Sequence, residues 1–193
     1  GAVILGKTNI PPSLGDWQSA NPIYGRTNNP RDLTRSPGGS SGGGAAAVAS
    51  GMVPLEFGSD IGGSIRVPAS FCGVIGHKPT WELIPSRGHT PPFTPTTGSA
   101  VPLGVIGPLA RSVDDLELAL SVLAGPEEME ARGYTLTLPP PRHARLGDYR
   151  VLVLDSHPLA PTSSDIKAAV GDLAERLAGE GAQVSRASDR LPD

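Results

Sequence analysis

Two serines carry the chemistry that this sequence suggests, because each stands among glycines in a short run. Ser40 lies in Gly38-Gly39-Ser40-Ser41-Gly42-Gly43 and Ser64 in Asp60-Ile61-Gly62-Gly63-Ser64-Ile65-Arg66, 24 residues further on, with no histidine between them. Glycine lets the backbone approach a substrate and leaves amide N–H groups free to face an oxyanion. A serine hydroxyl is a weak nucleophile at neutral pH unless a neighbouring base takes its proton. The pattern therefore predicts a serine nucleophile whose base is not an imidazole.

The two serine loops belong to a longer series of short motifs. In chain order these are Gly6-Lys7-Thr8-Asn9, Tyr24-Gly25, Asn28-Asn29-Pro30, Pro37 to Gly43, Gly58 to Arg66, Pro68-Ala69, Phe71-Cys72-Gly73 and Lys78-Pro79-Thr80. The series resembles the amidase signature family, and a weaker likeness through Gly104 to Ser112 extends it over well over half of the chain. The resemblance implies an α/β fold with a mixed central β-sheet flanked by helices on both faces. It also implies hydrolysis of carboxamides by a Ser-Ser-Lys triad.

The resemblance assigns roles to residues of the two loops. Ser64 resembles the nucleophile that accepts the acyl group, and Ser40 resembles the bridging serine, reached through a cis peptide bond, that passes on its proton. An oxyanion hole is expected from four backbone amides, those of Ile61, Gly62, Gly63 and Ser64. Support for these groups is expected from Ser41, Asp60 and Arg66. For Arg66 two interpretations stay open: it orients the nucleophile loop, or it only pairs with a carboxylate such as Asp60.

The lysine that serves the family as its base has no counterpart in this sequence. In the family it precedes the Gly-Lys-Thr-Asn segment by some tens of residues, and this chain opens at that segment. Lys7 and Lys78 match other family lysines that are not the base. We therefore expect a single amidase signature domain over residues 1–193 that is a fragment of a longer catalytic domain and inactive by itself. An inactive scaffold of the same fold is the alternative, and Lys7 is the local candidate for a substitute base.

Composition limits the partners that we expect. The chain has a formal net charge of −3, 38% hydrophobic residues and 4% aromatic residues, so no basic field attracts nucleic acid. Gly, Pro or charged residues interrupt every apolar run well before the roughly 20 residues of a membrane span, and no signal-peptide pattern opens the chain. We expect a cytoplasmic enzyme for a small-molecule amide, without cofactor or metal, with a homodimer left open. Cys72, the single cysteine, is expected to be a small buried residue.

Periodicity and turn residues predict strands and helices in alternation. Strands are predicted at residues 2–5, 54–58, 103–106 and 149–155, with a further strand entered by a turn at 180–184. Helices are predicted at 41–50, 113–123 and 164–178, the first two capped by the hydroxyls of Ser41 and Ser112. The apolar stripes predicted to be buried on the last two helices are Val113, Leu116, Leu120 and Leu123, and Ile166, Val170, Leu173 and Leu177.

Two segments without such periodicity are interpreted from their composition. Asp16-Trp17-Gln18-Ser19 is expected to line the acyl pocket, and the proline-rich residues 138–143 are expected to form a surface connector. The residues that would select one amide over another are not recognisable in this chain.

Two other functions remain as alternatives, a nucleotide-binding module with a phosphate-binding loop and a Ser-His-Asp hydrolase. Gly1 to Thr8 has the G-x-x-x-x-G-K-T spacing of a phosphate-binding loop, but its variable positions Ala, Val, Ile and Leu favour a strand. Pro11-Pro12 also break any helix soon after Thr8. A Ser-His-Asp hydrolase would pair Ser64 with His77 or His89, although the histidines lie among turn residues without metal-ligand spacing.

Overall fold

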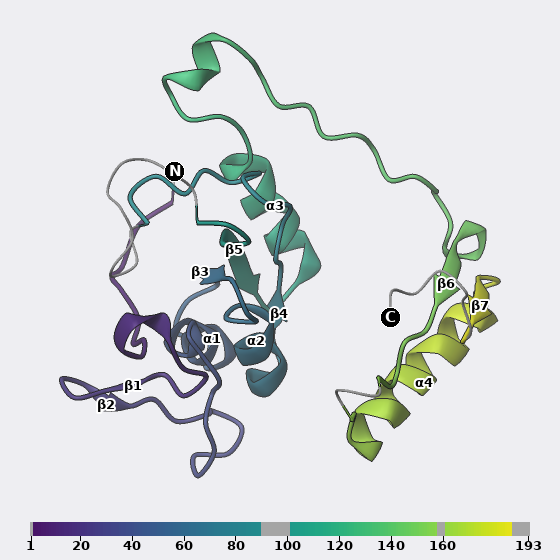
Figure 1. Ribbon diagram of the computed structural model, residues 1–193, viewed down its shortest axis with the longest axis horizontal. Coiled ribbons are helices and arrows are strands. Elements are labelled where there is room, and N and C mark those ends of the chain that lie inside the picture. Colours follow the sequence, from purple (N-terminus) through teal and green to yellow (C-terminus); the bar gives the residue numbers. More distant parts are fainter. Residues whose placement is uncertain (1, 90–100, 158–160, 187–193) are drawn as a thin grey trace. The chain divides into compact units, whose positions relative to one another are not determined.

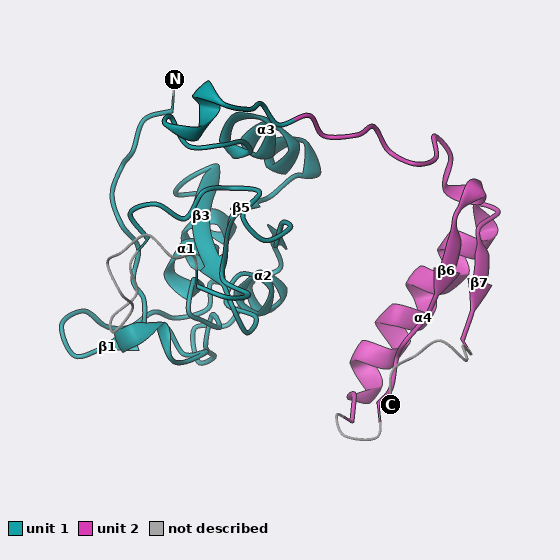
Figure 2. Cartoon of the chain, turned by 45° about the horizontal axis from the view of Figure 1, so that its top comes forward, with its two compact units in different colours: residues 1–136 teal, residues 137–193 magenta. Residues whose placement is uncertain are grey.

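Short strands alternate with helices along the chain, as expected of an α/β protein (Figure 1). The computed structural model describes residues 2–89, 101–157 and 161–186. Contacts divide the chain into two units, Gly1–Leu136 and Thr137–Asp193 (Figure 2). The α/β class is confirmed, and the single domain over residues 1–193 stays a prediction.

An antiparallel sheet of three strands forms the centre of the first unit. β5 (Val105–Ala110) lies between β3 (Leu55–Asp60) and β4 (Ile75–Gly76), and it pairs with β3 along the whole length of both strands. Because successive side chains of a strand point to opposite faces, the nearly continuous burial of β5 means that both of its faces are covered. β3 and β5 confirm the strands predicted at 54–58 and 103–106, although each ends later because the ladder continues.

Two helices rich in small residues pack beside this sheet. α1 (Gly42–Ala49) contacts β3 and β5, and α2 (Arg66–Cys72) contacts α1 and β4. Their shared core consists of Ala45, Ile65, Ala69, Cys72 and Leu109. A Cβ added to Gly44 would lie 2.4 Å from Cγ of Glu56, so glycine lets α1 approach β3. α1 confirms the helix predicted at 41–50, whereas α2 was not predicted.

The segment before the sheet departs from the sequence prediction. Residues 2–5 form no strand, and the side chain of Ile4 is 91% exposed. The prediction of a buried strand there is wrong, because a strand needs a paired neighbour and no described strand pairs with this run. A one-turn helix, η1 (Pro12–Leu14), and a short antiparallel pair, β1 (Ala20–Asn21) with β2 (Gly25–Arg26), follow it.

The helix after β5 confirms its predicted cap. α3 (Val113–Leu123) begins after Ser112, whose hydroxyl accepts a hydrogen bond from the Asp115 N–H over 3.1 Å and donates one to the Asp115 carboxylate over 2.7 Å. The predicted buried stripe is only partly right, since Leu116 is buried but Val113 is exposed. Val113 stands at the first helical position, before the first full turn of the helix. A one-turn helix, η2 (Glu130–Arg132), closes the unit.

The second unit is a small βαβ arrangement. After the one-turn helix η3 (Leu146–Asp148), β6 (Arg150–Leu152) pairs in parallel with β7 (Gln183–Ser185), and α4 (Ser164–Gly179) connects the two strands. These elements confirm the predicted strand, helix and turn into a further strand. The predicted buried face of α4 is only partly right: Ala174 is buried, Val170 and Leu177 are half-buried, and Ile166 and Leu173 are exposed. A pair of three-residue strands is too narrow to cover a helix of this length.

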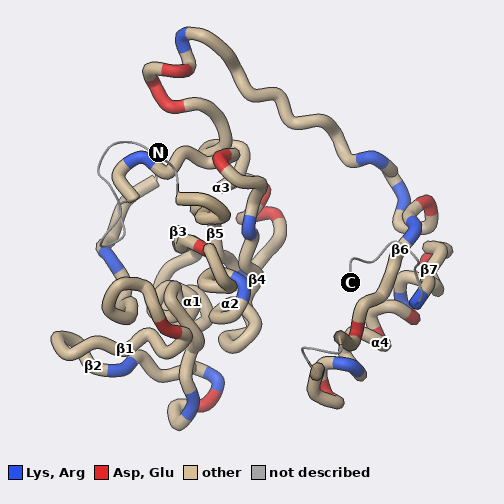
Figure 3. The backbone as a smooth tube through the Cα atoms, viewed as in Figure 1, with Lys and Arg blue, Asp and Glu red and all other residues tan. Residues whose placement is uncertain are grey.

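Charged residues of both signs are distributed over both units (Figure 3). None of the helices in the described ranges combines the length and the apolar character that crossing a bilayer requires.

Candidate active site

The two serine loops lie against each other in the first unit. Ser64 follows β3 and precedes α2, and Ser40 lies just before α1. The backbone N–H of Ser41 donates to the carbonyl oxygen of Ser64 over 3.1 Å, which joins the loops directly. Ser40 is 2% exposed, whereas Ser64 is half-buried. The Gly39–Ser40 peptide bond is cis, as the family resemblance implies. The fold therefore brings together the two serines that the sequence singled out.

Close packing on β3 fixes the loop that carries Ser40. A Cβ added to Gly58, in the middle of β3, would lie 2.4 Å from Oγ and 2.8 Å from Cβ of Ser41, so only glycine permits this approach. Ser41 is buried there and stands at the N-cap position of α1, but its side chain makes no capping hydrogen bond. The predicted hydroxyl cap is therefore wrong. The N–H of Gly42 donates instead to Oγ of Ser19 over 2.9 Å.

The carboxylate of Asp60 organises the loop that carries Ser64. It stands at the end of β3 with its side chain fully buried. One oxygen accepts the N–H of Gly63 over 2.8 Å, and the other accepts those of Ile65 and Arg66 over 3.1 and 3.3 Å. The guanidinium of Arg66 adds a two-pronged contact, Nε to Oδ2 at 3.0 Å and a terminal nitrogen to Oδ1 at 2.9 Å. Arg66 therefore fits both interpretations: it pairs with Asp60, and through Asp60 it helps to hold the loop that carries Ser64.

These contacts keep Asp60 charged. Burial by itself would raise the pKa of Asp60, but the hydrogen bonds from the Arg66 guanidinium and from the backbone of Gly63, Ile65 and Arg66 outweigh it and lower the pKa from 3.8 to about 2. The same pair raises the pKa of Arg66. A carboxylate so strongly held is a poor proton acceptor at neutral pH, so it is suited to holding the loop and not to acting as a base.

One of the four amides expected in the oxyanion hole is already engaged. Gly63, at a φ of 114° that favours glycine, directs its N–H at Asp60. Ile61 and Gly62 are exposed, and within the described ranges the amides of Ile61, Gly62 and Ser64 donate to no protein acceptor. The expectation of an oxyanion hole is therefore reduced to these three amides and stays a prediction.

The segment expected to line the acyl pocket divides into two parts. Trp17 is 51% exposed, and its ring lies 3.6 Å from the position that a Cβ on Gly63 would occupy, so it stands beside the nucleophile loop. Ser19 is fully buried, and its hydroxyl bonds the Ser40 carbonyl oxygen over 3.2 Å. Ser19 therefore lies behind the serine loop and not in a pocket. Sequence analysis missed this contact, because no local signal links two residues 21 positions apart.

Comparison with known proteins identifies this arrangement. Residues 1–191 match the model of the family described as Amidase. The chain belongs to the amidase signature family. It is 45% identical over 139 residues to a glutamyl-tRNA(Gln) amidotransferase subunit from Natranaerobius thermophilus, covering 72% of this chain and 27% of that protein. The corresponding subunit from Roseiflexus castenholzii is 40% identical over 191 residues, covering 97% of this chain and 38% of that protein.

A solved structure agrees with the sequence relatives. Fatty acid amide hydrolase superposes with a TM-score of 0.79 at 33% identity, covering 95% of this chain and 32% of that one. The chain therefore spans between about a quarter and two fifths of the length of these proteins. The amidase signature fold expected from the sequence is confirmed for the part that the chain represents.

Lys7, the local candidate for a substitute base, is not hydrogen-bonded to Ser40 in the described residues. Lys7 is exposed and Lys78 is half-exposed, and in the described ranges no hydrogen bond links either lysine to Ser40 or Ser64. The hydroxyl of the neighbouring Thr8 donates a hydrogen bond to the Glu56 carboxylate over 2.9 Å. Burial raises the pKa of Glu56. In the described residues Thr8 is followed by chain without secondary structure and then by the one-turn helix η1, and no α-helix starts at Thr8, so the phosphate-loop alternative lacks its helix N-terminus; Gly1 lies outside the described residues.

The alternative of a Ser-His-Asp hydrolase has no geometric support in the described residues. His77 uses its backbone N–H in a bond to Pro108 at the sheet, and neither it nor His89 bonds Ser64 in the described part of the chain. No described group of three His, Cys, Asp or Glu residues is arranged to hold a metal ion. Cys72 is buried, and burial raises the pKa of its thiol to about 11, which confirms the prediction of a small buried residue.

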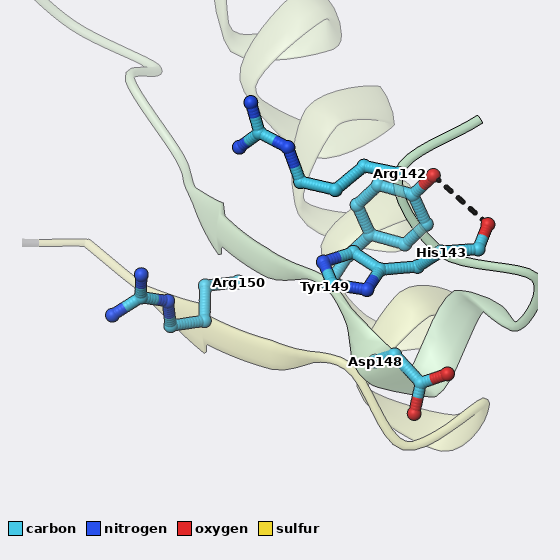
Figure 4. Close-up of a pocket in the computed structure, with 5 residues that line it drawn as sticks. All are labelled: Arg142, His143, Asp148, Tyr149 and Arg150. Carbon is cyan, nitrogen blue, oxygen red and sulfur yellow. Dashed lines mark hydrogen bonds between the residues drawn. The ribbon is translucent and has the colours of Figure 1, made fainter. Parts of the chain in front are cut away.

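A pocket also lies in the second unit. Its lining consists of Arg142, His143, Asp148, Tyr149 and Arg150 (Figure 4). The ring of His143 stands edge-on to that of Tyr149 at 4.8 Å, and the Tyr149 hydroxyl donates to the His143 carbonyl oxygen over 3.2 Å. Arg142 and His143 come from the connector, Asp148 from η3 and Arg150 from β6, and none of the lining residues belongs to a serine loop.

Proposed function

We propose that the full-length protein hydrolyses a carboxamide C–N bond through an acyl-enzyme on Ser64. The observation that carries this proposal is the direct joining of the two serine loops, in which Ser41 N–H bonds the Ser64 carbonyl while Ser40 is buried beside it. Ser64 Oγ attacks the amide carbonyl carbon, and the C–N bond then breaks as the amine receives a proton. Water attacks the ester that remains and releases the acid.

Ser40 is the proposed proton carrier. It accepts the proton of Ser64 as the nucleophile attacks and returns a proton to the leaving amine. The base behind Ser40 is, by family resemblance, a lysine that is not among these 193 residues. The isolated chain is therefore expected to be inactive, and the alternative of an inactive scaffold remains for the case in which the full-length protein has no base.

The oxyanion is proposed to bind three amides, those of Ile61, Gly62 and Ser64, while Gly63 holds the loop through Asp60. Asp60 and Arg66 act as positioning residues, because they touch the loop backbone and not the substrate position. Such prepositioned donors lower the barrier because they need no reorganisation as charge develops. Ser41 supports the arrangement by joining the loops through its backbone.

The substrate class is a small-molecule amide, for which a linear amide is the proposal. The relatives named above act, by their names, on different compounds, so the family match does not select one of them. A cytoplasmic location and a homodimer also stay predictions, to be tested by cell fractionation and by light scattering of the purified full-length protein.

The test is substitution of the two serines in the full-length protein. Ser64→Ala is expected to lower kcat for a hydrolysed amide by at least about a thousandfold without loss of folding, since loss of one oxyanion donor alone costs about a hundredfold to a thousandfold. Ser40→Ala is expected to be severe but less so. Activity of the Ser64 variant within tenfold of wild type would end the proposal.

A further inference from the structure

A third serine is built into the site without being part of the proposed triad. Ser19 is fully buried and precedes β1. Its hydroxyl donates to the Ser40 carbonyl oxygen over 3.2 Å and accepts the N–H of Gly42 over 2.9 Å. A hydroxyl has one hydrogen to donate, so this geometry uses it to tie together the residues on either side of Ser41.

The backbone of Ser19 is itself anchored. Its carbonyl oxygen accepts the N–H of Thr27, next to β2, over 3.1 Å and the side-chain amide of Asn9 over 3.2 Å. The backbone carbonyl oxygen of Asn9 in turn accepts the N–H of Gly43 over 3.2 Å. Ser19 and Asn9 thus bond to each other and, from outside the helix, to the first two residues of α1.

Positions 39 and 42 leave room for no side chain larger than the hydrogen of glycine. A Cβ on Gly42 would lie 2.3 Å from the Ser19 hydroxyl oxygen, and a Cβ on Gly39 would lie 2.4 Å from the carbonyl oxygen of Asp16. Contacts this short do not occur between real side chains, so glycines on both sides of the Ser40-Ser41 pair are required. The segment from Asp16 to Ser19 therefore packs directly against the backbone on both sides of Ser40 and restricts its position.

We propose that Ser19 is a positioning residue of the proton relay, a proposal that rests on the proposed function. By holding the Ser40 carbonyl and the Gly42 amide, it fixes the backbone that carries the Ser40 hydroxyl, next to the residue whose N–H bonds the Ser64 carbonyl. It touches neither the substrate nor a reacting atom. Its effect is exerted through the backbone on either side of Ser41.

A role of Ser19 in the proton relay predicts different effects on amide and ester hydrolysis, whereas a purely structural role predicts equal effects. An amide expels a basic amine, which must receive a proton as the C–N bond breaks, whereas a p-nitrophenyl ester expels a phenolate that needs none. General acid assistance contributes about a hundredfold or more when it is required. A misplaced Ser40 should therefore slow amide hydrolysis more than ester hydrolysis, while general loosening of the site should slow both alike.

The experiment compares Ser19→Ala with wild type in the full-length protein, using a p-nitrophenyl ester and an amide of the same acyl group. Both substrates need Ser40 to accept the proton of Ser64, but only the amide also needs a proton returned to its leaving group, so we expect kcat for the amide to fall at least about tenfold and the ratio of amide to ester kcat to fall at least about threefold, with KM for both within about twofold. Ser19→Thr, which keeps the hydroxyl, is expected to recover most of the amide rate. Ser50→Ala is the matched control, because Ser50 also bonds a backbone carbonyl of α1 over 2.8 Å but at the far end of that helix.

The results that would overturn the role of Ser19 differ from the result that would overturn the proposed function. An unchanged ratio of amide to ester kcat in Ser19→Ala overturns the role of Ser19, and so does a threonine variant that recovers nothing. Activity that survives in Ser64→Ala instead overturns the proposed function. If Ser19→Ala does not fold, as judged by circular dichroism, Ser19→Cys gives the same comparison, because a thiol fills the space but is a weak donor and acceptor.

Discussion

Replacing Asp60 with asparagine removes one charge from a buried network and leaves its shape. The lowering of the Asp60 pKa from 3.8 to about 2 corresponds to about 2.5 kcal/mol of stability at neutral pH, at about 1.4 kcal/mol per pKa unit. Breaking a fully buried ion pair costs about 3 to 5 kcal/mol, but the Arg66 side chain is 54% exposed, so water solvates it once its partner is gone. We therefore expect Asp60→Asn to lower the free energy of unfolding by about 2 kcal/mol at pH 7.

The pH dependence of that difference identifies its cause. Because folding lowers the Asp60 pKa, the stabilisation is present above pH 3.8 and is lost as the pH falls toward 2. Urea unfolding of the full-length wild type and variant at pH 7, 5, 4 and 3 should therefore show a gap that narrows below pH 4. Glu117→Gln, on the exposed face of α3, is the control and should change the stability by less than about 0.5 kcal/mol. Equal stabilities at pH 7, or a gap that persists unchanged to pH 3, would refute the reasoning.

Three further predictions concern the frame of the site. Gly58→Ala should destabilise the full-length protein by at least about 1 to 3 kcal/mol, because the new methyl group would overlap Ser41; a melting temperature equal to wild type would contradict this. Ser112→Ala should cost about 1 kcal/mol through loss of the α3 cap, measured by urea unfolding, with an unchanged transition midpoint as the contrary result. Lys7→Met in the full-length protein should leave kcat within about twofold of wild type, and a loss of a hundredfold would make Lys7 the base.

The parts of the fold that sequence predicted are those governed by local signals. α1, α3 and α4 follow from small or periodic apolar residues, and the Ser112 cap follows from the residue three positions later. α2 was missed because it has seven residues, begins without a side-chain cap and contains a proline in its first turn, which is tolerated only there. Local signals do not reveal which segments meet, and the buried faces of α3 and α4 were partly misjudged for that reason.

In the candidate site, too, sequence predicted what local signals determine and missed what long-range contacts determine. Ser40 and Ser64 were recognisable from their glycine-rich runs, and the structure brings those runs together. The tie from Ser19 to Ser40 was not predictable, because it joins residues 21 positions apart through the Ser40 backbone carbonyl. Likewise, nothing in the run Ile61 to Ser64 indicates that Gly63 alone turns its N–H to Asp60.

The most direct test of the account is the site of acylation. The full-length protein is incubated with an activated ester, quenched in acid, digested and analysed by mass spectrometry, beside the isolated 193-residue chain and the Ser64→Ala variant. The account predicts one acyl group per full-length protein on Ser64, none on the variant and none on the isolated chain at neutral pH. Acylation on a residue other than Ser64, or acylation of Ser64 in the isolated chain, would contradict it.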